Sequence, residues 1–349
     1  MLTFVIFILM LGIIVAIHEF GHFMFAKLFG VYVYEYSIGM GKKIFSKKPK
    51  KSETEYNLRM VPIGGFVRLA GEEGEDGDKS VPPERKLYKK GFIQRFLIFF
   101  MGPGFNFILA FITLFISALI YGSISNMPVV GNVPENYPAY TAGIQVGDTI
   151  LEVDGDVIKT WDDILWIVQT SNGKETLFKI KDVNGNIKEI KIVPEKVESD
   201  NGGSSYVFGI GKSTKKERGF VPSFKYAISK TKSLFKIMLV TVKSLFTGGV
   251  SVNDLSGPVG IYNIVGEQSK EGIESLLYLL AYLSINVGVI NLIPFPAFDG
   301  GHILFLIIEK VMRKPVPEKI ESTITGIGFI LLILLMIYIT CHDVINLFH

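Results

Sequence analysis

Residues 2–29 read LTFVIFILMLGIIVAIHEFGHFMFAKLF, the first long apolar segment of the chain. It is almost continuously apolar, and it exceeds the roughly 20 residues that a helix needs to cross a bilayer. His18, Glu19 and His22 interrupt its middle. Ionisable groups inside a membrane span are costly and are therefore functional candidates by default. The stretch predicts a retained membrane helix that carries a reactive site.

The string His18-Glu19-Phe20-Gly21-His22 has the H-E-x-x-H pattern. Positions i and i+4 lie about 40° apart around a helix, so the two histidines share one face. Neutral imidazoles placed in this way can hold one zinc ion. Glu19 is then placed to accept a proton from the attacking water. The competing interpretation is a helix whose buried histidines bond to their neighbours, and lipid weakens it by removing solvating alternatives.

The composition fits a membrane protein with a soluble part. The chain has 349 residues, of which 48% are hydrophobic, and its mean hydropathy is +0.38. The net charge of +3 is too small to argue for a nucleic-acid partner. The single Cys341 excludes an internal disulfide and a cysteine zinc site. The amino terminus lacks the basic segment and the small-residue cleavage site of a secretory signal.

Apolar runs and basic segments together predict the membrane topology. Four runs are expected to span the membrane: 2–29, 96–121, 276–296 and 324–346. The segments between the first and second runs and between the third and fourth are rich in Lys and Arg, whereas both ends of the chain lack them. The positive-inside rule then places both basic segments in the cytoplasm and both termini outside. The middle segment, 122–275, lies outside as well, because the spans alternate.

Residues 31–70 are expected to form strands at the cytoplasmic membrane surface rather than a free loop. β-Branched and aromatic residues fill 31–34 and 54–61, and glycines punctuate them. The edge of this β element, with Thr54, Glu55, Tyr56 and Asn57, is expected to pair with an unwound substrate segment. Strand addition would satisfy the backbone groups that an unwound helix exposes. A hairpin that only stabilises the first span is an equally open alternative.

The pattern changes to short strands and turns over residues 127–212. Residues 138–148, followed by 150–155, resemble a PDZ domain, which implies a groove that receives an extended peptide beside a strand. A rigid spacer is the alternative. Asn184-Gly185 between two β-rich runs predicts a hairpin turn, and residues 161–170 fit a short amphipathic helix.

Residues 213–275 are expected to return the chain to the membrane. Residues 220–247 fit an amphipathic helix that lies on the outer membrane surface or packs on the spans. Residues 256–260, Ser-Gly-Pro-Val-Gly, are expected to form a turn.

Two histidines leave a catalytic zinc one ligand short, because such a site commonly has three protein ligands and a water. The best source is the segment from Asn291 to His302, where Pro294 and Pro296 break the third span. Asp299 lies just past the break and is the favoured donor, with His302, one turn further on, as its rival. Asp299 acting only as a helix N-cap is the structural alternative.

Together these motifs resemble the site-two protease family of intramembrane zinc metalloproteases, most closely the bacterial regulator-of-sigma-E protease (RseP-type) branch. The resemblance covers essentially the whole chain. It implies that Asp299 rather than His302 is the third zinc ligand, that Asn291 helps to hold the substrate strand, and that the β element binds substrate. The family usually has leucine where this chain has Phe298, which leaves the ligand intact. The motifs that carry the resemblance are His18–His22, Glu55-Tyr56, Gly102-Pro103 with Asn106, the PDZ-like segment, Ser256–Gly260 and Asn291–Gly301.

The expected fold is a multi-pass α-helical membrane protein of about four transmembrane helices, with a cytoplasmic β element and an inserted extracytoplasmic PDZ domain. The expected domains are the two parts of the protease core at 1–126 and 276–349, the PDZ domain at 127–212, and the helix and linker at 213–275.

The resemblance implies cleavage of a transmembrane segment in the bacterial cytoplasmic membrane, with Zn²⁺ on His18, His22 and Asp299, Glu19 as general base, and a site open toward the cytoplasm. Its substrates would be single-span proteins such as anti-sigma factors or signal-peptide remnants, and the PDZ domain would take peptide tails. Besides substrates, the lipid bilayer is the expected partner, and no nucleic acid is expected. A zinc-binding membrane scaffold with a PDZ domain and no turnover is the alternative.

Overall fold

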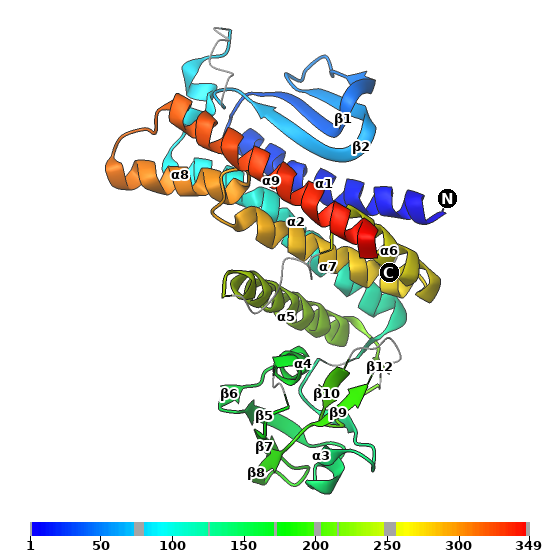
Figure 1. Cartoon of the computed structure of the whole chain (residues 1–349). Coiled ribbons are helices and arrows are strands. Elements are labelled where there is room, and N and C mark those ends of the chain that lie inside the picture. The colour runs from blue at the N-terminus through cyan, green and yellow to red at the C-terminus, as the bar shows by residue number, and fades with distance from the viewer. Residues whose placement is uncertain are drawn as a thin grey trace. The chain divides into compact units, whose positions relative to one another are not determined.

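The computed structural model describes residues 2–72, 80–124, 126–170, 173–198, 204–214, 216–247 and 256–346. The chain forms two compact units (Figure 1). The helical unit comprises Met1–Thr113 and Met238–His349, and the β-rich unit comprises Leu114–Ile237.

Within the described residues, four helices are long and apolar enough to cross a membrane. This finding confirms the four predicted apolar runs. In lipid a spanning segment must satisfy its backbone hydrogen bonds internally, which is why an apolar run of this length folds as a helix. The third helix ends four residues earlier than predicted, because the prolines at 294 and 296 cannot continue it. The helices are α1 (Leu2–Leu28), α2 (Phe92–Tyr121), α7 (Ile273–Leu292) and α9 (Glu318–Asn346).

Two further helices of the helical unit were not predicted. The helix α6 (Pro258–Glu271) begins inside the predicted turn at 256–260, so that prediction is wrong from Pro258 onward. Proline is well suited to the first position of a helix, where its missing N–H is not needed. Asp343 of α9 caps this helix, since its Oδ2 accepts the Gly260 N–H at 2.8 Å. The helix α8 (Asp299–Met312) begins directly after the double-proline break.

The β element consists of two long antiparallel strands, β1 (Val33–Lys47) and β2 (Glu55–Leu69), which confirms the predicted strands in 31–70. Both strands bend, so each pairs with its partner twice. Residues 35–38 pair with 65–68 on one side and with 55–58 on the other, and 56–58 also pair with 45–47. The segment 65–69 is therefore an outer edge of this sheet, whereas 55–58 lie in its interior.

The edge segment 65–69 packs against α1. A Cβ on Gly65 would lie 3.1 Å from Glu19 Cγ and 2.9 Å from the Ser37 carbonyl oxygen, so only glycine permits this approach. Tyr36 Oη donates to the Ala16 carbonyl at 2.8 Å. A buried apolar cluster joins the sheet to the helices, and its members are Ala26, Val31, Val33, Leu69, Leu87, Ile98, Phe99 and Leu306. Two short 3₁₀ turns, Pro83–Arg85 and Leu87–Lys89, lead into α2.

The β-rich unit is built on a four-stranded antiparallel sheet in the order β6-β5-β7-β8, with α4 (Trp161–Thr170) beside it. The predicted hairpin is confirmed, since Asn184 and Gly185, whose φ is +91°, lie in the turn that joins β7 to β8. Its other elements are short. The strands are β3 (Ser123–Ile124), β4 (Val130–Asn132), β5 (Thr149–Val153), β6 (Asp156–Val157), β7 (Thr176–Lys181), β8 (Ile187–Ile192), β9 (Glu195–Glu198), β10 (Ser204–Val207), β11 (Gly211–Lys212) and β12 (Lys216–Glu217), with helix α3 (Pro138–Thr141).

The helix α5 (Phe220–Thr247) has the predicted bounds, and its first half is tied to α4 by a buried ion pair. Lys230 Nζ lies 2.8 Å from Asp162 Oδ2, and the two side chains are 10% and 8% exposed. Ser233 and Asn126 also donate to Asp162. Burial alone would raise the pKa of Asp162, but the Lys230 ammonium and these hydrogen bonds hold it below 3.8. The pair therefore contributes stability above that pH and loses it as the pH falls through the lowered pKa.

Replacing Lys230 by methionine is expected to lower the free energy of unfolding of the β-rich unit by about 3–5 kcal/mol, because Asp162 is left buried and unpaired. Urea unfolding of the full-length chain followed by tryptophan fluorescence measures this directly, since Trp161 and Trp166 are the chain's two tryptophans and both lie in α4. The difference in the free energy of unfolding between the variant and the unaltered chain should become smaller in acid, because Asp162 is then protonated.

Lys236→Met is the matched control. It removes the ion pair between Lys236 and Asp163, in which the lysine side chain is 62% exposed. An ion pair of an exposed lysine contributes about 1 kcal/mol or less to the free energy of unfolding. Equal losses in the two variants would show that the buried pair does not hold α5 to α4.

Candidate metal centre

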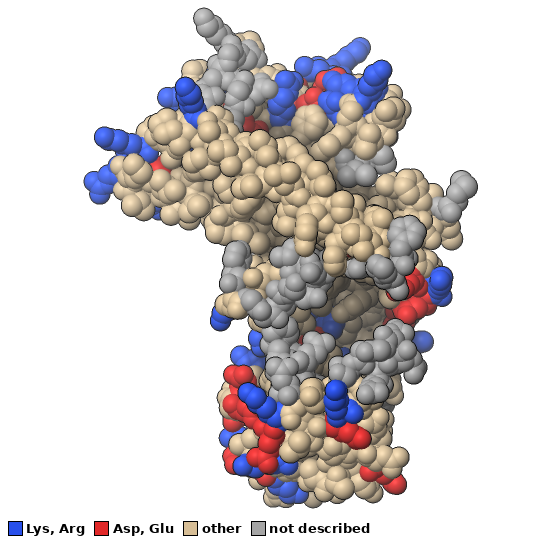
Figure 2. All heavy atoms as spheres, viewed as in Figure 1, with Lys and Arg blue, Asp and Glu red and all other residues tan. Residues whose placement is uncertain are grey.

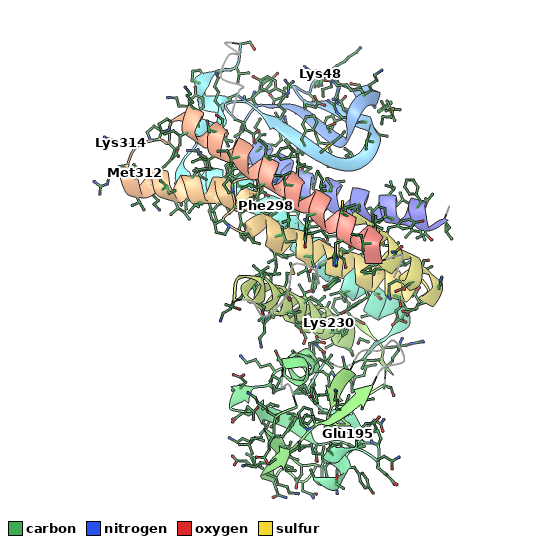
Figure 3. The ribbon with its side chains drawn as sticks, viewed as in Figure 1. Lys48, Glu195, Lys230, Phe298, Met312 and Lys314 are labelled. Atoms are coloured by element: carbon green, nitrogen blue, oxygen red, sulfur yellow. The ribbon has the colours of Figure 1, made fainter. Side chains whose placement is uncertain are left out.

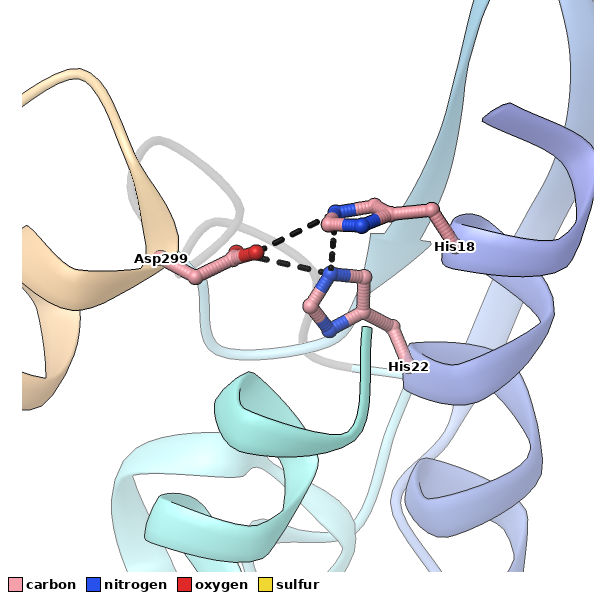
Figure 4. A group of neighbouring side chains, drawn as sticks. All are labelled: His18, His22 and Asp299. Carbon is pink, nitrogen blue, oxygen red and sulfur yellow. Dashed lines mark hydrogen bonds and ion pairs between the residues drawn. The ribbon is translucent and has the colours of Figure 1, made fainter. Parts of the chain in front are cut away.

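The Nε2 atoms of His18 and His22 lie 3.2 Å from each other (Figure 4). The other nitrogen of each ring is held by α2. His22 Nδ1 donates to the Ile98 carbonyl at 2.8 Å, which leaves a lone pair on its Nε2. The Asn106 carboxamide lies 3.2 Å from His18 Nδ1 and fixes that ring. Outer contacts of this kind orient metal-binding histidines.

Asp299 completes the group from the first turn of α8. Its Oδ2 lies 3.1 Å from His18 Nε2, and its Oδ1 lies 3.4 Å from His22 Nε2. Phe298 is the N-cap residue of α8 and makes no side-chain cap bond. The Asp299 carboxylate is therefore turned toward the histidines rather than used as an N-cap.

The donor set fits a zinc ion. One ligand atom from each of His18, His22 and Asp299 lies within 4.8 Å of the other two. Two imidazoles and one carboxylate, with room for a water, are a ligand set that catalytic zinc takes. Elsewhere in the described ranges, no other cluster of His, Cys, Asp or Glu has this geometry.

The group lines a cavity of about 280 Å³ in the helical unit. Glu19 lines the same cavity but does not belong to the ligand group. The Val67 backbone hydrogen-bonds to the Glu19 carboxylate, so the edge of the β element orients it. Glu19 is therefore a fixed carboxylate beside the ligands.

The predicted substrate-binding residues fall in two places. Asn291, in the last turn of α7, lines the cavity, and its Nδ2 donates to the Val287 carbonyl at 2.9 Å. Thr54 and Glu55 do not line it: the first donates to the Val33 carbonyl and the second pairs with Lys43 at 2.8 Å.

Tyr56 and Asn57 are also absent from the cavity lining, and both lie in the segment that is paired on its two sides. This register leaves the interior segment no free edge for another strand. The edge that meets the cavity is instead 65–69, where Phe66, Val67 and Leu69 contribute to the lining.

Glu72 is a cavity residue that the sequence did not reveal. It lines the cavity, and its Oε2 accepts the Leu69 N–H at 3.4 Å. Burial raises the pKa of its carboxyl to about 7. No periodic signal marks Glu72, because it lies in a turn after the strand.

His302, the rival third ligand, also lines the cavity but has other partners. Its ring stacks on Phe99, with centroids 4.9 Å apart, and its Nδ1 lies 3.4 Å from Glu321 Oε1. These contacts favour Asp299 as the ligand.

Two glycines set the distance between α1 and α2 at the site. A Cβ on Gly21 would lie 2.0 Å from the Met101 carbonyl oxygen, and a Cβ on Gly102 would lie 2.2 Å from His22 Nε2. Both positions therefore require glycine, because the first contact is with backbone and the second is with a proposed ligand atom.

Replacing Gly102 by alanine is expected to displace His22 and to lower the zinc affinity by at least about tenfold, with less zinc retained on purification. Even changes to outer partners of metal ligands lower metal affinity by about 10- to 100-fold. Gly104→Ala is the control in the same helix, since the nearest atom to a Cβ there would be the sulfur of the flexible Met101 side chain, at 3.2 Å. Metal analysis of the purified proteins measures the effect, and equal zinc contents would contradict the proposed role of Gly102.

Known proteins are similar to this chain over nearly its whole length. Peptidase family M50 matches residues 6–335. A relative from Fusobacterium nucleatum is 39% identical and covers 100% of both chains. The regulator of sigma-W protease RasP of Bacillus subtilis and the zinc metalloprotease RasP of Bacillus licheniformis are each 32% identical over 99% of both chains.

Among solved structures, the PDZ domain of an SdrC-like protein from Listeria innocua covers 27% of this chain and 99% of its own, at 22% identity and a TM-score of 0.21. A score this low does not assign the fold of the β-rich unit. The sequence match, in contrast, spans both helices of the ligand group. This chain belongs to peptidase family M50, the site-two protease family of intramembrane zinc metalloproteases.

Proposed function

We propose that the chain hydrolyses a peptide bond within a transmembrane segment of its substrate, using Zn²⁺ held by His18, His22 and Asp299. This proposal rests on one observation. Helices far apart in the sequence bring two imidazoles and a carboxylate within 4.8 Å of one another, beside Glu19 in a single cavity.

Zinc in this site would polarise the scissile carbonyl and lower the pKa of a bound water toward neutrality. The protein supplies the remaining steps. Glu19 accepts the proton of the attacking water and passes a proton to the leaving amine. The Val67 backbone holds the Glu19 carboxylate, while Ile98 and Asn106 hold the two imidazole rings.

The substrate strand adds to the edge at 65–69, and Asn291 contacts it from α7. Two observations support this. The edge pairs with no second strand among the described residues, and three of its residues line the cavity. The N–H groups of Val67 and Leu69 now bond to Glu19 and Glu72, and a substrate carbonyl would replace Glu72. Thr54 to Asn57 then act by holding the sheet together.

The substrates are single-span membrane proteins, such as anti-sigma factors or signal-peptide remnants. The name of the Bacillus subtilis relative, a regulator of sigma-W protease, supports the first class. We place the chain as a multi-pass protein of the bacterial cytoplasmic membrane, with both termini and the β-rich unit outside. The Lys- and Arg-rich segments beside the β element and α8 support an active site open toward the cytoplasm.

The β-rich unit acts as a PDZ domain over about 127–212, followed by the helix and linker of 213–275. A cavity of about 330 Å³ supports this assignment. Trp161, Ile164 and Leu165 of α4 line one part of it, and the extended segment 207–211 lines another. A peptide tail would lie along that segment, which gives backbone hydrogen bonds and side-chain pockets together.

Removal and return of zinc test the proposed function. Purified full-length protein should cleave a single-span substrate in detergent, stop after chelation, and resume when zinc is restored. A non-catalytic scaffold would release no product at any zinc level, and that result would overturn the proposal. Membership of peptidase family M50 already disfavours the scaffold.

A further inference from the structure

A second cavity of the helical unit lies where α8 ends and α2 begins, at the end of α8 opposite Asp299. It has a volume of about 260 Å³. Figure 3 labels Met312 and Lys314 at this end of α8, and Figure 2 shows Lys and Arg gathered there. The charged lining residues are Arg95, Glu309, Lys310, Arg313 and Lys314, and the apolar ones are Phe92, Leu306 and Pro315.

One side of this cavity is formed by a largely buried ion pair between Arg95 and Glu309. Arg95 Nη1 lies 2.7 Å from Glu309 Oε2, and the two side chains are only 19% and 16% exposed. Glu309 Oε1 also accepts the Val316 N–H at 3.1 Å. Both oxygens of this carboxylate are thus engaged, whereas Arg95 Nε is buried and has no hydrogen-bond partner among the described residues.

Three more cations line the cavity. Lys310 Nζ lies 4.1 Å from the centroid of the Phe92 ring, a cation–π contact that keeps the ammonium at the cavity. Arg313 ends α8 in the left-handed conformation, with φ +54°, and Lys314 follows it. Four cations against one engaged carboxylate make the lining strongly positive.

Apolar side chains adjoin the charges and are open to the surroundings. Ile93 is 61% exposed, Ile307 44%, Val311 78% and Met312 62%. Phe92, the first residue of the candidate span α2, lines the cavity itself. The positive cavity therefore lies at one end of an apolar membrane-facing surface, the depth at which lipid phosphates lie. A soluble anion would use the charges but not the apolar surface.

We propose that this cavity binds the phosphate of an anionic glycerophospholipid whose acyl chains lie along the exposed apolar residues of α2 and α8. Basic pockets at the cytoplasmic ends of membrane helices recognise such headgroups through charge and hydrogen bonds. The lipid would hold together two helices that both contribute to the metal centre, α2 through Ile98 and α8 through Asp299.

Native mass spectrometry of the full-length protein in neutral detergent tests this site, with phosphatidylglycerol and phosphatidylcholine offered at equal concentrations. The unaltered chain should retain the anionic lipid preferentially, and less of it at higher salt. In the double variant Lys310→Gln/Lys314→Gln, retention of phosphatidylglycerol should fall by about 25-fold, since each basic residue near an anionic surface contributes about fivefold. Retention of phosphatidylcholine should not change.

The matched control is Lys47→Gln/Lys48→Gln, which removes the same charge from exposed lysines at the end of β1. Equal losses in the two double variants would overturn the site, because net charge alone would then explain binding. Displacement of phosphatidylglycerol by inorganic phosphate would overturn the lipid assignment. An unchanged helical circular dichroism spectrum shows that a variant is folded, and Arg313→Gln replaces the first double variant if it is not.

Discussion

Replacing Glu19 by glutamine is expected to abolish peptide-bond cleavage while leaving zinc bound. Glutamine has nearly the same shape as glutamate but cannot accept the proton of the attacking water. The loss of a positioned general base typically costs about 10²- to 10⁴-fold in rate. Zinc should stay, because Glu19 lines the cavity without belonging to the ligand group.

Two measurements on the same preparation decide this prediction: the rate of cleavage of a single-span substrate, and zinc per mole of protein. Glu72→Gln is the control, because it replaces another carboxyl group of the cavity by an amide whose oxygen can still accept the Leu69 N–H. Substantial cleavage by Glu19→Gln, or an equal loss in Glu72→Gln, would contradict the assignment of Glu19 as the base.

Asp299→Asn is expected to lose zinc, whereas His302→Ala is expected to retain it. Asp299 oxygens lie 3.1 Å and 3.4 Å from the two histidine Nε2 atoms. An asparagine there keeps one neutral oxygen but removes the charge that balances the metal. Zinc affinity should therefore fall by more than the roughly 10- to 100-fold seen when an outer partner of a ligand is removed.

His302 tests the alternative, because its ring stacks on Phe99 and its Nδ1 lies near Glu321. Competition with a chromophoric zinc chelator measures the affinity of each variant. Zinc loss in His302→Ala together with full retention in Asp299→Asn would reverse the ligand assignment.

The sequence predicted those parts of the fold that depend on local pattern. An apolar run of sufficient length has few ways to satisfy its backbone in lipid, so the spans could be predicted from composition alone. H-E-x-x-H predicted two histidines on one helix face because helical geometry places i and i+4 together. The structure places both Nε2 atoms toward Asp299. Its place just past the double-proline break favoured it over His302, and the family resemblance strengthened that choice.

Features that depend on pairing between distant residues could not be predicted. The strands of 31–70 were expected, but their bend places 65–69, rather than the predicted edge with Thr54 to Asn57, beside α1. No local pattern marks that register. The buried Lys230–Asp162 pair joins residues 68 positions apart in the chain, and neither residue is unusual in its own segment.

The proposed chemistry depends on a zinc site assembled from α1 and α8. X-ray absorption at the zinc edge of the full-length Glu19→Gln protein, loaded with one equivalent of zinc, tests it most directly. The spectrum should show two imidazole nitrogens and carboxylate or water oxygens at about 2.0–2.2 Å, and no sulfur. A spectrum with a sulfur ligand, or with fewer than two imidazoles, would contradict it.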